Sequence, residues 1–286
     1  MISLKVKAPA KLNLFLEITG RRADGFHELD SLFVFASEAD CLSLEKAKSW
    51  SFGVKGSFAE TLTQENSEDN LVMRAARTII KELQLDEALK ICLVKNLPVA
   101  AGLGGGSADA AAVLKAICQL YQKQPDQQRL NDLALQLGAD VPSCLISQAQ
   151  IVRGIGEISH RLTAFPGLHS VIVNPGVPLS TAAVFKSWSR DFTPARSWPQ
   201  TSDVQTWFDF IQERHNCLQE TAITLCPLIA EVLSEVSQTQ GCHLSRMSGS
   251  GPSCFGLYKT EVEAQEAAVL LSKAHPSWWI RYAKLQ

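Results

Sequence analysis

The sequence predicts an α+β protein of two domains. Residues 4–18 alternate between apolar and polar at period two, which is typical of a strand, whereas residues 107–120 are Ala-rich and helical. The length of 286 residues is comfortable for two domains, and the run Arg-Gly-Ile-Gly at 153–156 interrupts the pattern. We therefore expect one domain at 1–155 and a second at 156–286.

The composition is that of an ordinary globular protein. Apolar residues make up 46% and charged residues 20%, and the net charge of −2 comes without any block of Lys or Arg. This balance argues against binding to nucleic acid or to an anionic membrane. No apolar run approaches the ~18 residues of a membrane span. The eight cysteines are scattered without a C-x-x-C pair, so we expect free thiols and a cytoplasmic protein.

Further elements follow from periodicity and from capping signals. A helix is expected at 67–83, with Glu68 and Asp69 in its first turn, and another at 129–137. Thr260 and Glu263 form a capping box that opens a helix running to about residue 274. Short strands are expected at 32–35, 91–94, 171–173, 243–247, 254–258 and 279–282.

Four glycines, Gly102, Gly104, Gly105 and Gly106, stand directly before the Ala-rich helix. Each loses extra backbone entropy when it is ordered. Backbone N–H groups and the positive end of the helix dipole would point at one anion there, most often a phosphate. The loop does not match the Walker A pattern, because it lacks the lysine of that pattern. It does not match the dinucleotide-binding fingerprint either, because Ser107 stands where the third glycine is required. A tight turn without ligand is the alternative, but the strand–loop–helix context favours phosphate binding.

Three other features have ordinary structural explanations when each is taken alone. Lys11, which shares a strand face with Asn13, is expected to be an exposed strand lysine. Asp140 precedes Val-Pro and is typical of a helix N-cap. Residues 248–253 have the composition of a hairpin turn. Their occurrence together with the glycine loop weakens these explanations.

Three segments in order resemble the motifs of the GHMP kinases, the family named after galactokinase, homoserine kinase, mevalonate kinase and phosphomevalonate kinase. They are Lys7-Ala-Pro-Ala-Lys-Leu-Asn-Leu, Leu97-Pro-Val-Ala-Ala-Gly-Leu-Gly-Gly-Gly-Ser and Met247-Ser-Gly-Ser-Gly-Pro-Ser-Cys-Phe. Arg22-Ala-Asp-Gly-Phe-His and Leu137-Gly-Ala-Asp-Val-Pro most closely resemble the branch that phosphorylates a cytidyl diphosphate derivative of methylerythritol in the non-mevalonate isoprenoid pathway. The resemblance extends from Lys7 to about Tyr258.

The resemblance implies an N-terminal, ATP-binding domain similar to the second domain of ribosomal protein S5. It implies a C-terminal, substrate-binding domain of ferredoxin-like fold, with the active site in the cleft between them. The implied activity is phosphoryl transfer from ATP, with Mg²⁺, to a 2-hydroxyl group; Asp140 would be the catalytic base and Lys11 its partner at that hydroxyl. No protein ligand to the metal is assigned. The ATP phosphates would be held by Pro98, Val99, Ala100, Ala101, Gly102, Leu103, Gly104, Gly105, Gly106, Ser107 and Ala108.

The resemblance also implies a pocket for the cytidyl group. Its residues would be Asn13, Phe26, His27, Thr181 and Phe185. Phe26 and Phe185 would sandwich the cytosine while His27 reads its edge, although both phenylalanines fit a core position equally well. The family often has Tyr at position 26 and a second Ser at position 108. With Phe and Ala there, we expect the phosphate contacts to rest on Ser107 and on backbone amides.

Alternative functions remain open from the sequence. Another GHMP kinase, of the homoserine or mevalonate type, is the nearest. A non-catalytic S5-like RNA-binding module would need a basic face, which the net charge disfavours. An NAD-dependent oxidoreductase is the weakest, because the glycine spacing is wrong. The oligomeric state is left as monomer or homodimer, and the polar, Trp-bearing stretch 188–209 has no assigned role.

Overall fold

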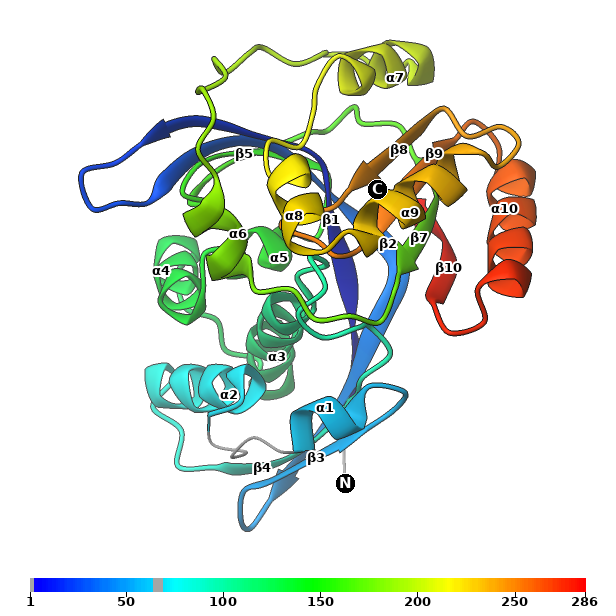
Figure 1. Ribbon diagram of the computed structural model, residues 1–286. Coiled ribbons are helices and arrows are strands. Elements are labelled where there is room, and N and C mark those ends of the chain that lie inside the picture. Colours follow the sequence, from blue (N-terminus) through cyan, green and yellow to red (C-terminus); the bar gives the residue numbers. More distant parts are fainter. Residues whose placement is uncertain (1–2, 64–68) are drawn as a thin grey trace. The chain divides into compact units, whose positions relative to one another are not determined.

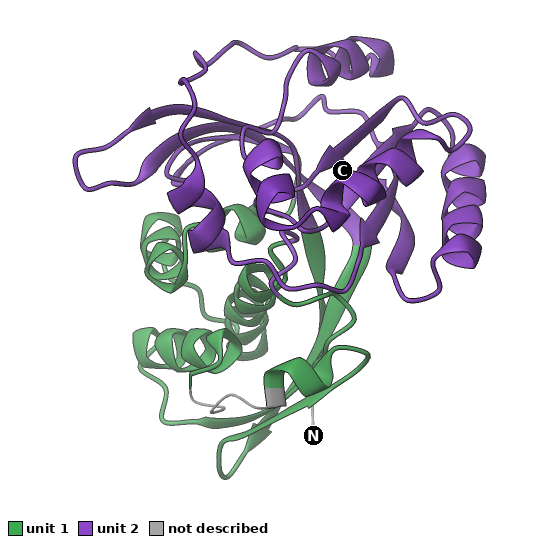
Figure 2. Ribbon diagram, in the orientation of Figure 1, with its two compact units in different colours: residues 1–10, 38–99, 104–147 green, residues 11–37, 100–103, 148–286 purple. Residues whose placement is uncertain are grey.

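The computed structural model describes residues 3–63 and 69–286, and it confirms the α+β class, with strands and helices mixed throughout. The chain forms two compact units, each built from separate stretches (Figure 2). Unit 1 comprises residues 1–10, 38–99 and 104–147, and unit 2 comprises residues 11–37, 100–103 and 148–286. The predicted boundary at residue 155 divides the chain differently and stays a prediction.

Unit 1 combines a small sheet with a cluster of packed helices (Figure 1). Strand β3 (Ser51–Lys55) runs parallel to β4 (Ala88–Val94), which pairs antiparallel with the last third of β2 (His27–Ala47). The helices of this unit are α1 (Ala59–Thr63), α2 (Leu71–Glu82), α3 (Gly105–Tyr121), α4 (Gln127–Leu137) and α5 (Val141–Ile146). Helix α3 packs against α2, α4 and α5, and its run of small, buried alanines permits this close approach.

Helix starts in unit 1 differ from the predicted ones by a few residues. Helix α3 begins at Gly105, two residues before the predicted start. Helix α2 begins after Asn70, whose side chain accepts a hydrogen bond from Val72 N, so Asp69 lies before the helix and its placement in the first turn was wrong. Asn70 is the better cap because its side-chain oxygen reaches the free N–H groups. Glu68 lies outside the described residues.

Unit 2 is built on an antiparallel sheet. Strand β7 (Leu168–Asn174) lies between β9 (Cys254–Tyr258) and β10 (Trp279–Leu285), and β8 (Leu244–Met247) pairs with β9. The first part of β2 pairs with β5 (Gln150–Gly154), which pairs with β6 (Ile158–Arg161). The helices are α6 (Thr181–Ser187), α7 (Val204–Gln212), α8 (Gln219–Leu225), α9 (Leu228–Ser237) and α10 (Glu261–Ala274). Helices α9 and α10 pack against the sheet, and α10 opens with the predicted capping box.

Strand β1 (Ser3–Arg21) confirms the predicted N-terminal strand but not its single buried face. From residue 10 to residue 18 both faces are buried. Lys11 is 4% exposed, so its interpretation as an exposed strand lysine was wrong. The polar side chains of the second face, such as those of Asn13 and Glu17, are held by hydrogen bonds inside unit 2. A buried polar face of this kind cannot be told from a solvated one by periodicity alone.

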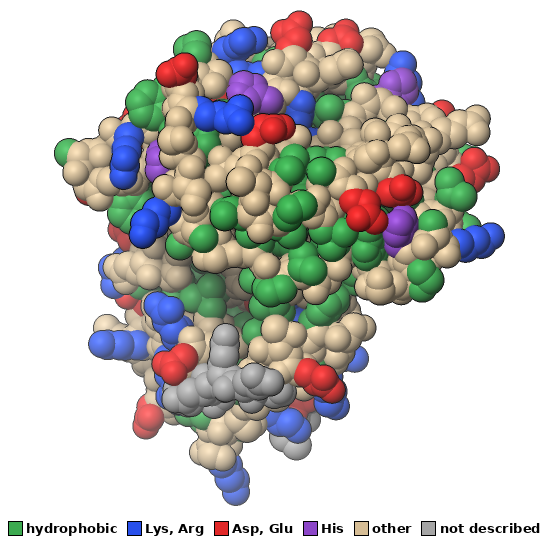
Figure 3. All heavy atoms as spheres, in the orientation of Figure 1, with side chains coloured by type: hydrophobic (Ala, Val, Ile, Leu, Met, Phe, Trp, Pro, Cys, Tyr) green, Lys and Arg blue, Asp and Glu red, His purple; other side chains and the backbone are tan. Residues whose placement is uncertain are grey.

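Three general expectations concern the whole described chain. All eight cysteines, each of which lies in the described residues, are free thiols, as predicted. None of the described helices is both long and apolar enough to cross a bilayer. Figure 3 shows acidic and basic side chains interspersed over the face that it presents, without a dominant cluster of either sign.

Candidate active site

Unit 2 brings the first and third motifs together around residues 101–103 of the glycine loop. All three carbonyl oxygens of this stretch accept hydrogen bonds from the other two motifs. The bonds run from Lys11 N to Leu103 O (2.8 Å), from Ser248 Oγ to Gly102 O (3.0 Å) and from Ser253 N to Ala101 O (3.2 Å). Residues 248–253 do form the hairpin turn between β8 and β9, and the same turn fixes the glycine loop.

Gly102 is required by this arrangement. Its φ of +72° lies in the left-handed region, which residues with a Cβ rarely adopt. A Cβ at this position would overlap the carbonyl oxygen of Ser248 and lie 3.0 Å from that of Gly251. The backbone of the third motif can therefore approach the loop only because position 102 has no side chain.

The Lys11 ammonium is held in place from inside unit 2. Its Nζ donates to Asn13 Oδ1 at 3.0 Å and lies 4.1 Å from the centroid of the Phe33 ring. Asn13 Nδ2 donates in turn to Ser31 Oγ at 2.9 Å, and Ser31 Oγ donates to Phe15 O. This series of hydrogen bonds fixes the orientation of the Asn13 amide, so that its oxygen faces the Lys11 ammonium. A buried ammonium of this kind needs such partners, because burial without them is strongly unfavourable.

The remaining loop residues form the start of α3 in unit 1. Gly104 is the N-cap, in the left-handed conformation, and Gly105, Gly106 and Ser107 make the first turn. The first four N–H groups of a helix have no partner within the helix, whereas Ala108 N already donates to Gly104 O at 2.9 Å. The N–H groups of residues 104–107 are therefore left without a partner inside the helix, as at any helix N-terminus that can accept an anion.

Asp140 occupies the predicted N-cap position of α5, with Pro142 in the first turn. However, its side chain makes no capping hydrogen bond to that helix. Capping of α5 therefore does not explain why an aspartate stands at this half-buried position. Helix α5 packs against α3, the helix that starts in the glycine loop.

A buried ion cluster that the sequence reasoning missed fixes the loop in unit 1. Lys95 Nζ lies 2.5 Å from Asp40 Oδ2 and 2.8 Å from Asp109 Oδ2. Asp40 Oδ1 also accepts hydrogen bonds from the N–H groups of Asn96 and Leu97. The cluster joins the end of β4 to the second turn of α3, on both sides of the loop. The only indication of this cluster in the sequence was Asp109, a single acidic residue within a run of alanines.

The cluster holds two carboxylates and one ammonium in a dry environment. Burial raises the pKa of Asp109 to about 7, against the opposing effect of the Lys95 ammonium. Asp109 Oδ1 is buried without a hydrogen-bond partner, which agrees with a carboxyl group that is readily protonated. The same buried cluster therefore ties the loop down and makes its stability depend on pH.

Unit 2 also brings together two of the predicted substrate residues. The rings of His27 and Phe185 lie 5.5 Å apart between centroids, and Trp188, which was not predicted, meets His27 edge-on at 5.4 Å. Thr181, one turn before Phe185 on α6, has its Oγ1 2.8 Å from Ser250 Oγ. Helix α6 thus connects the aromatic group to the turn at 248–253.

Phe26 lies at the end of the tight turn between β1 and β2 and is 59% exposed. A core position for Phe26 is therefore wrong, whereas Phe185 is half-buried. Burial and the nearby Arg21 guanidinium lower the pKa of His27. A neutral imidazole offers one donor and one acceptor, which suits it to read the edge of a base.

Magnesium requires oxygen donors, and unit 1 offers two of them among the predicted residues. Within residues 3–63 and 69–286, no group of three or more His, Cys, Asp or Glu side chains is arranged to hold a metal ion. Mg²⁺ is commonly bound by one or two carboxylates together with substrate phosphates. The Asp140 carboxylate and the Ser107 hydroxyl fit that mode of binding.

Comparison with known proteins identifies the family. Residues 70–148 match the GHMP kinases N terminal domain, and residues 200–276 match the GHMP kinases C terminal domain. The chain belongs to the GHMP kinase family. The predicted resemblance, the fold class and the kinase activity are thereby confirmed: the chain is a phosphotransferase that uses ATP.

Full-length relatives place the chain more closely within the GHMP kinases. It is 43% identical over 288 residues to the 4-diphosphocytidyl-2-C-methyl-D-erythritol kinase of Paramagnetospirillum magneticum, covering 100% of this chain and 99% of the relative. It is 45% identical over 280 residues to the same-named kinase of Parvibaculum lavamentivorans, covering 96% and 95%. The crystal structure of a 4-(cytidine 5'-diphospho)-2C-methyl-D-erythritol kinase superimposes with a TM-score of 0.81 at 34% identity, covering 99% of both chains.

The close approach at Gly102 makes a stability prediction. Gly102→Ala should lower the free energy of unfolding by about 2 kcal/mol or more, because the left-handed backbone and the Ser248 carbonyl both oppose a Cβ. Gly106→Ala is the matched control, since a Cβ there meets nothing within 4 Å. Urea unfolding measures both variants. Equal stability of the two variants would contradict the role given to Gly102.

The buried cluster predicts a pH dependence. In the unfolded chain Asp109 would titrate near about 3.9, so between roughly pH 4 and pH 7 the folded state keeps a proton that the unfolded state has lost. This contribution is complete below about pH 4 and is lost as pH rises through about 7. Asp109→Asn should flatten the stability profile in that window, whereas Asp86→Asn, at an exposed position, should not. Parallel profiles of wild type and Asp109→Asn in urea unfolding would refute the assignment.

Proposed function

We propose that the chain transfers the γ-phosphate of ATP to the 2-hydroxyl group of 4-diphosphocytidyl-2-C-methyl-D-erythritol, with Mg²⁺, in the cytoplasm. The observation that carries this proposal is the full-length identity of 43–45% to kinases of that name. The arrangement of the three motifs supports it, because Lys11 and residues 248–253 are fixed against the glycine loop within one unit.

The N–H groups at the start of α3 would bind the phosphates of ATP. Phosphoryl transfer proceeds through a loose transition state, so positioning and neutralisation of charge contribute more than covalent chemistry. The N–H groups of Gly104 through Ser107 and the positive end of α3 supply both. Mg²⁺, when bound, would neutralise phosphate charge, and the Ser107 hydroxyl is the side-chain group that would help to hold it.

Asp140 would act as the general base. Its carboxylate is not used to cap α5, and it would accept the proton as the acceptor oxygen bonds to the γ-phosphorus and the bond to the leaving ADP breaks. Lys11 would orient the hydroxyl and stabilise the negative charge that develops on its oxygen. Asn13 contributes by holding the ammonium through Oδ1.

The aromatic residues of unit 2 would recognise the cytidyl group. We propose that Phe26 and Phe185 stack on the cytosine and that His27, held between Phe185 and Trp188, pairs with its edge. Stacking needs only the ring face, so Phe at position 26 suffices where the family often has Tyr. Thr181 and Asn13 would complete the substrate contacts.

The direct test is ADP release with Mg²⁺-ATP and one of four acceptors: 4-diphosphocytidyl-2-C-methyl-D-erythritol, homoserine, mevalonate or galactose. We expect strong turnover of the cytidyl substrate alone. Selective turnover of another alcohol would support the kinase activity and refute the proposed substrate. No ADP from folded protein with any acceptor would refute the proposed activity and reopen the binding-module alternative.

Asp140→Asn and Lys11→Ala should each reduce kcat by about 10²-fold or more, because each removes an interaction formed with the reacting hydroxyl. The KM for ATP should change little, since the N–H groups that would bind the phosphates remain. Asp132→Asn and Lys7→Ala, at exposed positions of the same unit or strand, are the matched controls. Wild-type turnover in either test variant would refute the role of that residue.

Phe185→Ala and Phe26→Ala should raise the KM for the cytidyl substrate by about tenfold each, since loss of base stacking costs ~1–3 kcal/mol. The KM for ATP should be unaffected. Phe192→Ala is the matched control, because Phe192 is another exposed phenylalanine of unit 2. Steady-state kinetics with each substrate varied in turn makes the measurement. An equal effect on both KM values would argue against a cytosine-specific contact.

A further inference from the structure

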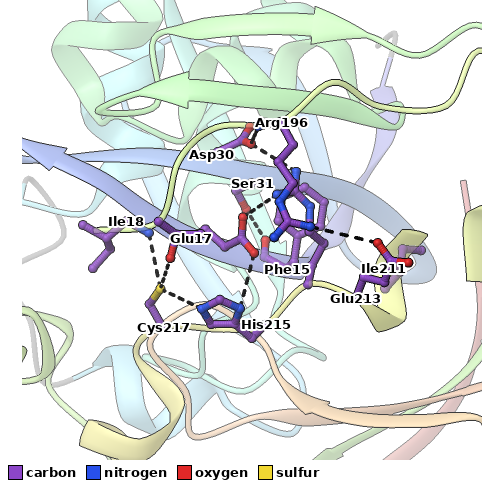
Figure 4. Close-up of polar contacts among 12 residues, drawn as sticks. Phe15, Glu17, Ile18, Asp30, Ser31, Arg196, Ile211, Glu213, His215 and Cys217 are labelled. Carbon is purple, nitrogen blue, oxygen red and sulfur yellow. Dashed lines mark hydrogen bonds and ion pairs between the residues drawn. The ribbon is translucent and has the colours of Figure 1, made fainter. Parts of the chain in front are cut away.

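A nucleophilic and basic pair lies in unit 2 outside the residues assigned to phosphoryl transfer (Figure 4). Cys217 Sγ lies 3.5 Å from His215 Nε2. The other ring nitrogen, His215 Nδ1, lies 3.3 Å from Glu17 Oε1. The order thiol, imidazole, carboxylate is the arrangement in which an imidazole takes a proton from a nucleophile while a carboxylate orients the ring.

The backbone fixes this geometry. Cys217 N donates to Leu16 O at 2.8 Å and Leu16 N donates to His215 O at 3.1 Å, so residues 215–217 run beside β1 as a short bridge. The Glu17 side chain is only 1% exposed. Its Oε2 accepts from Arg214 at 2.6 Å, whereas Oε1 is buried with no hydrogen-bond partner. That unsatisfied oxygen faces the His215 ring.

The position of Glu17 selects the tautomer of the histidine. A proton on Nδ1 faces the carboxylate, which leaves the lone pair of Nε2 directed at the sulfur. Burial, together with Arg246, Arg214 and Arg196, lowers the pKa of His215, so the ring is neutral near pH 7 and can accept the thiol proton. Glu17 Oε1 would then face the imidazolium that forms.

Charged groups surround the pair. Ile18 N donates to the sulfur at 3.5 Å. The charged groups around the pair come from the adjacent strands and from the segments on either side, and arginines outnumber carboxylates among them. They are Glu17 on β1, Asp30 on β2, Arg153 on β5, Arg196 in the stretch 188–203, Glu213 and Arg214 before the pair, and Arg246 on β8. Positive charge near a cysteine stabilises the thiolate, which is the reactive form.

We propose that Cys217 is an activated thiol that undergoes exchange with low-molecular-weight disulfides, with His215 as its base. The Cys217 thiol gives its proton to His215 Nε2, and the resulting thiolate attacks one sulfur of the small disulfide. The disulfide bond of the reagent breaks, its second sulfur leaves and takes up the proton, and a mixed disulfide remains on Cys217. The reagent is the oxidant, so electrons and atoms balance.

A neighbouring base distinguishes Cys217 from the other cysteines. Cys217 is buried, with 9% of the residue exposed, and the His215 side chain beside its sulfur is 57% exposed. Burial raises the pKa of the thiols of Cys118, Cys242 and Cys254, which disfavours their thiolate forms. Because Cys41, Cys92 and Cys226 are less buried than Cys217, a faster reaction at Cys217 would come from its base and not from its exposure.

The test uses the full chain and 2-hydroxyethyl disulfide at pH 7, with the mixed disulfide at each cysteine followed over time by peptide mass spectrometry. Cys217 should react about tenfold faster than the half-buried Cys92. His215→Gln should slow the reaction at Cys217 about tenfold. His160→Gln, a substitution of an exposed histidine in the same unit, should leave that rate unchanged.

Thermal unfolding of each unmodified variant checks that the substitutions leave the protein folded. Equal rates at Cys217 and Cys92 in the wild-type protein would overturn the proposal. An unchanged rate at Cys217 in folded His215→Gln would do the same. If His215→Gln fails to fold, the wild-type rates decide: a rate at Cys217 no higher than that at Cys92 overturns the activated thiol, and a rate about tenfold higher supports it.

Discussion

The arrangement of the candidate site depends on the hydrogen bonds that the carbonyl groups of residues 101–103 accept. Each bond comes from a segment far away in the sequence, either from β1 or from the turn at 248–253. The bond from Lys11 N fixes the position of the strand that carries the proposed catalytic lysine. The bond from Ser248 Oγ requires a backbone approach that Gly102 alone permits. One short stretch of backbone therefore determines how Lys11 and the turn at 248–253 lie in unit 2.

Buried charge is the second constraint, and it is met in each unit by a compact network. Lys95 lies between two carboxylates in unit 1, and Arg214 joins Glu17 to Asp30 in unit 2. Removal of a charged group from water is strongly unfavourable unless partners replace the water. Such networks are more useful for fixing geometry than for adding stability, because a partner that moves leaves a buried charge unpaired. The first network lies beside the glycine loop, and the second includes a residue of the strand that carries Lys11.

The sequence predicts the locally determined features well. The capping box of α10, the strand β9 and the glycine loop before α3 are confirmed because their signals lie within a few residues of one another. The buried polar face of β1 and the cluster around Lys95 could not be predicted, because their partners are distant in sequence. The same holds for Trp188, whose contact with His27 depends on how α6 packs. The motifs indicate which residues matter, whereas the contacts that position them are properties of the fold.

The glycine loop divides its backbone groups between two tasks. Its carbonyl groups at 101–103 are occupied by the other motifs, and its N–H groups at 104–107 have no partner within α3. Free carbonyl oxygens near an anion would repel it. Because these carbonyl oxygens accept hydrogen bonds from Lys11, Ser248 and Ser253, the groups of the loop that are left for a phosphate are N–H donors. A lysine side chain could supply the same positive charge, as in other phosphate loops, but this loop has none. In the proposed function, backbone N–H groups would therefore take the role of a charged side chain, and glycine is the residue that permits this backbone geometry.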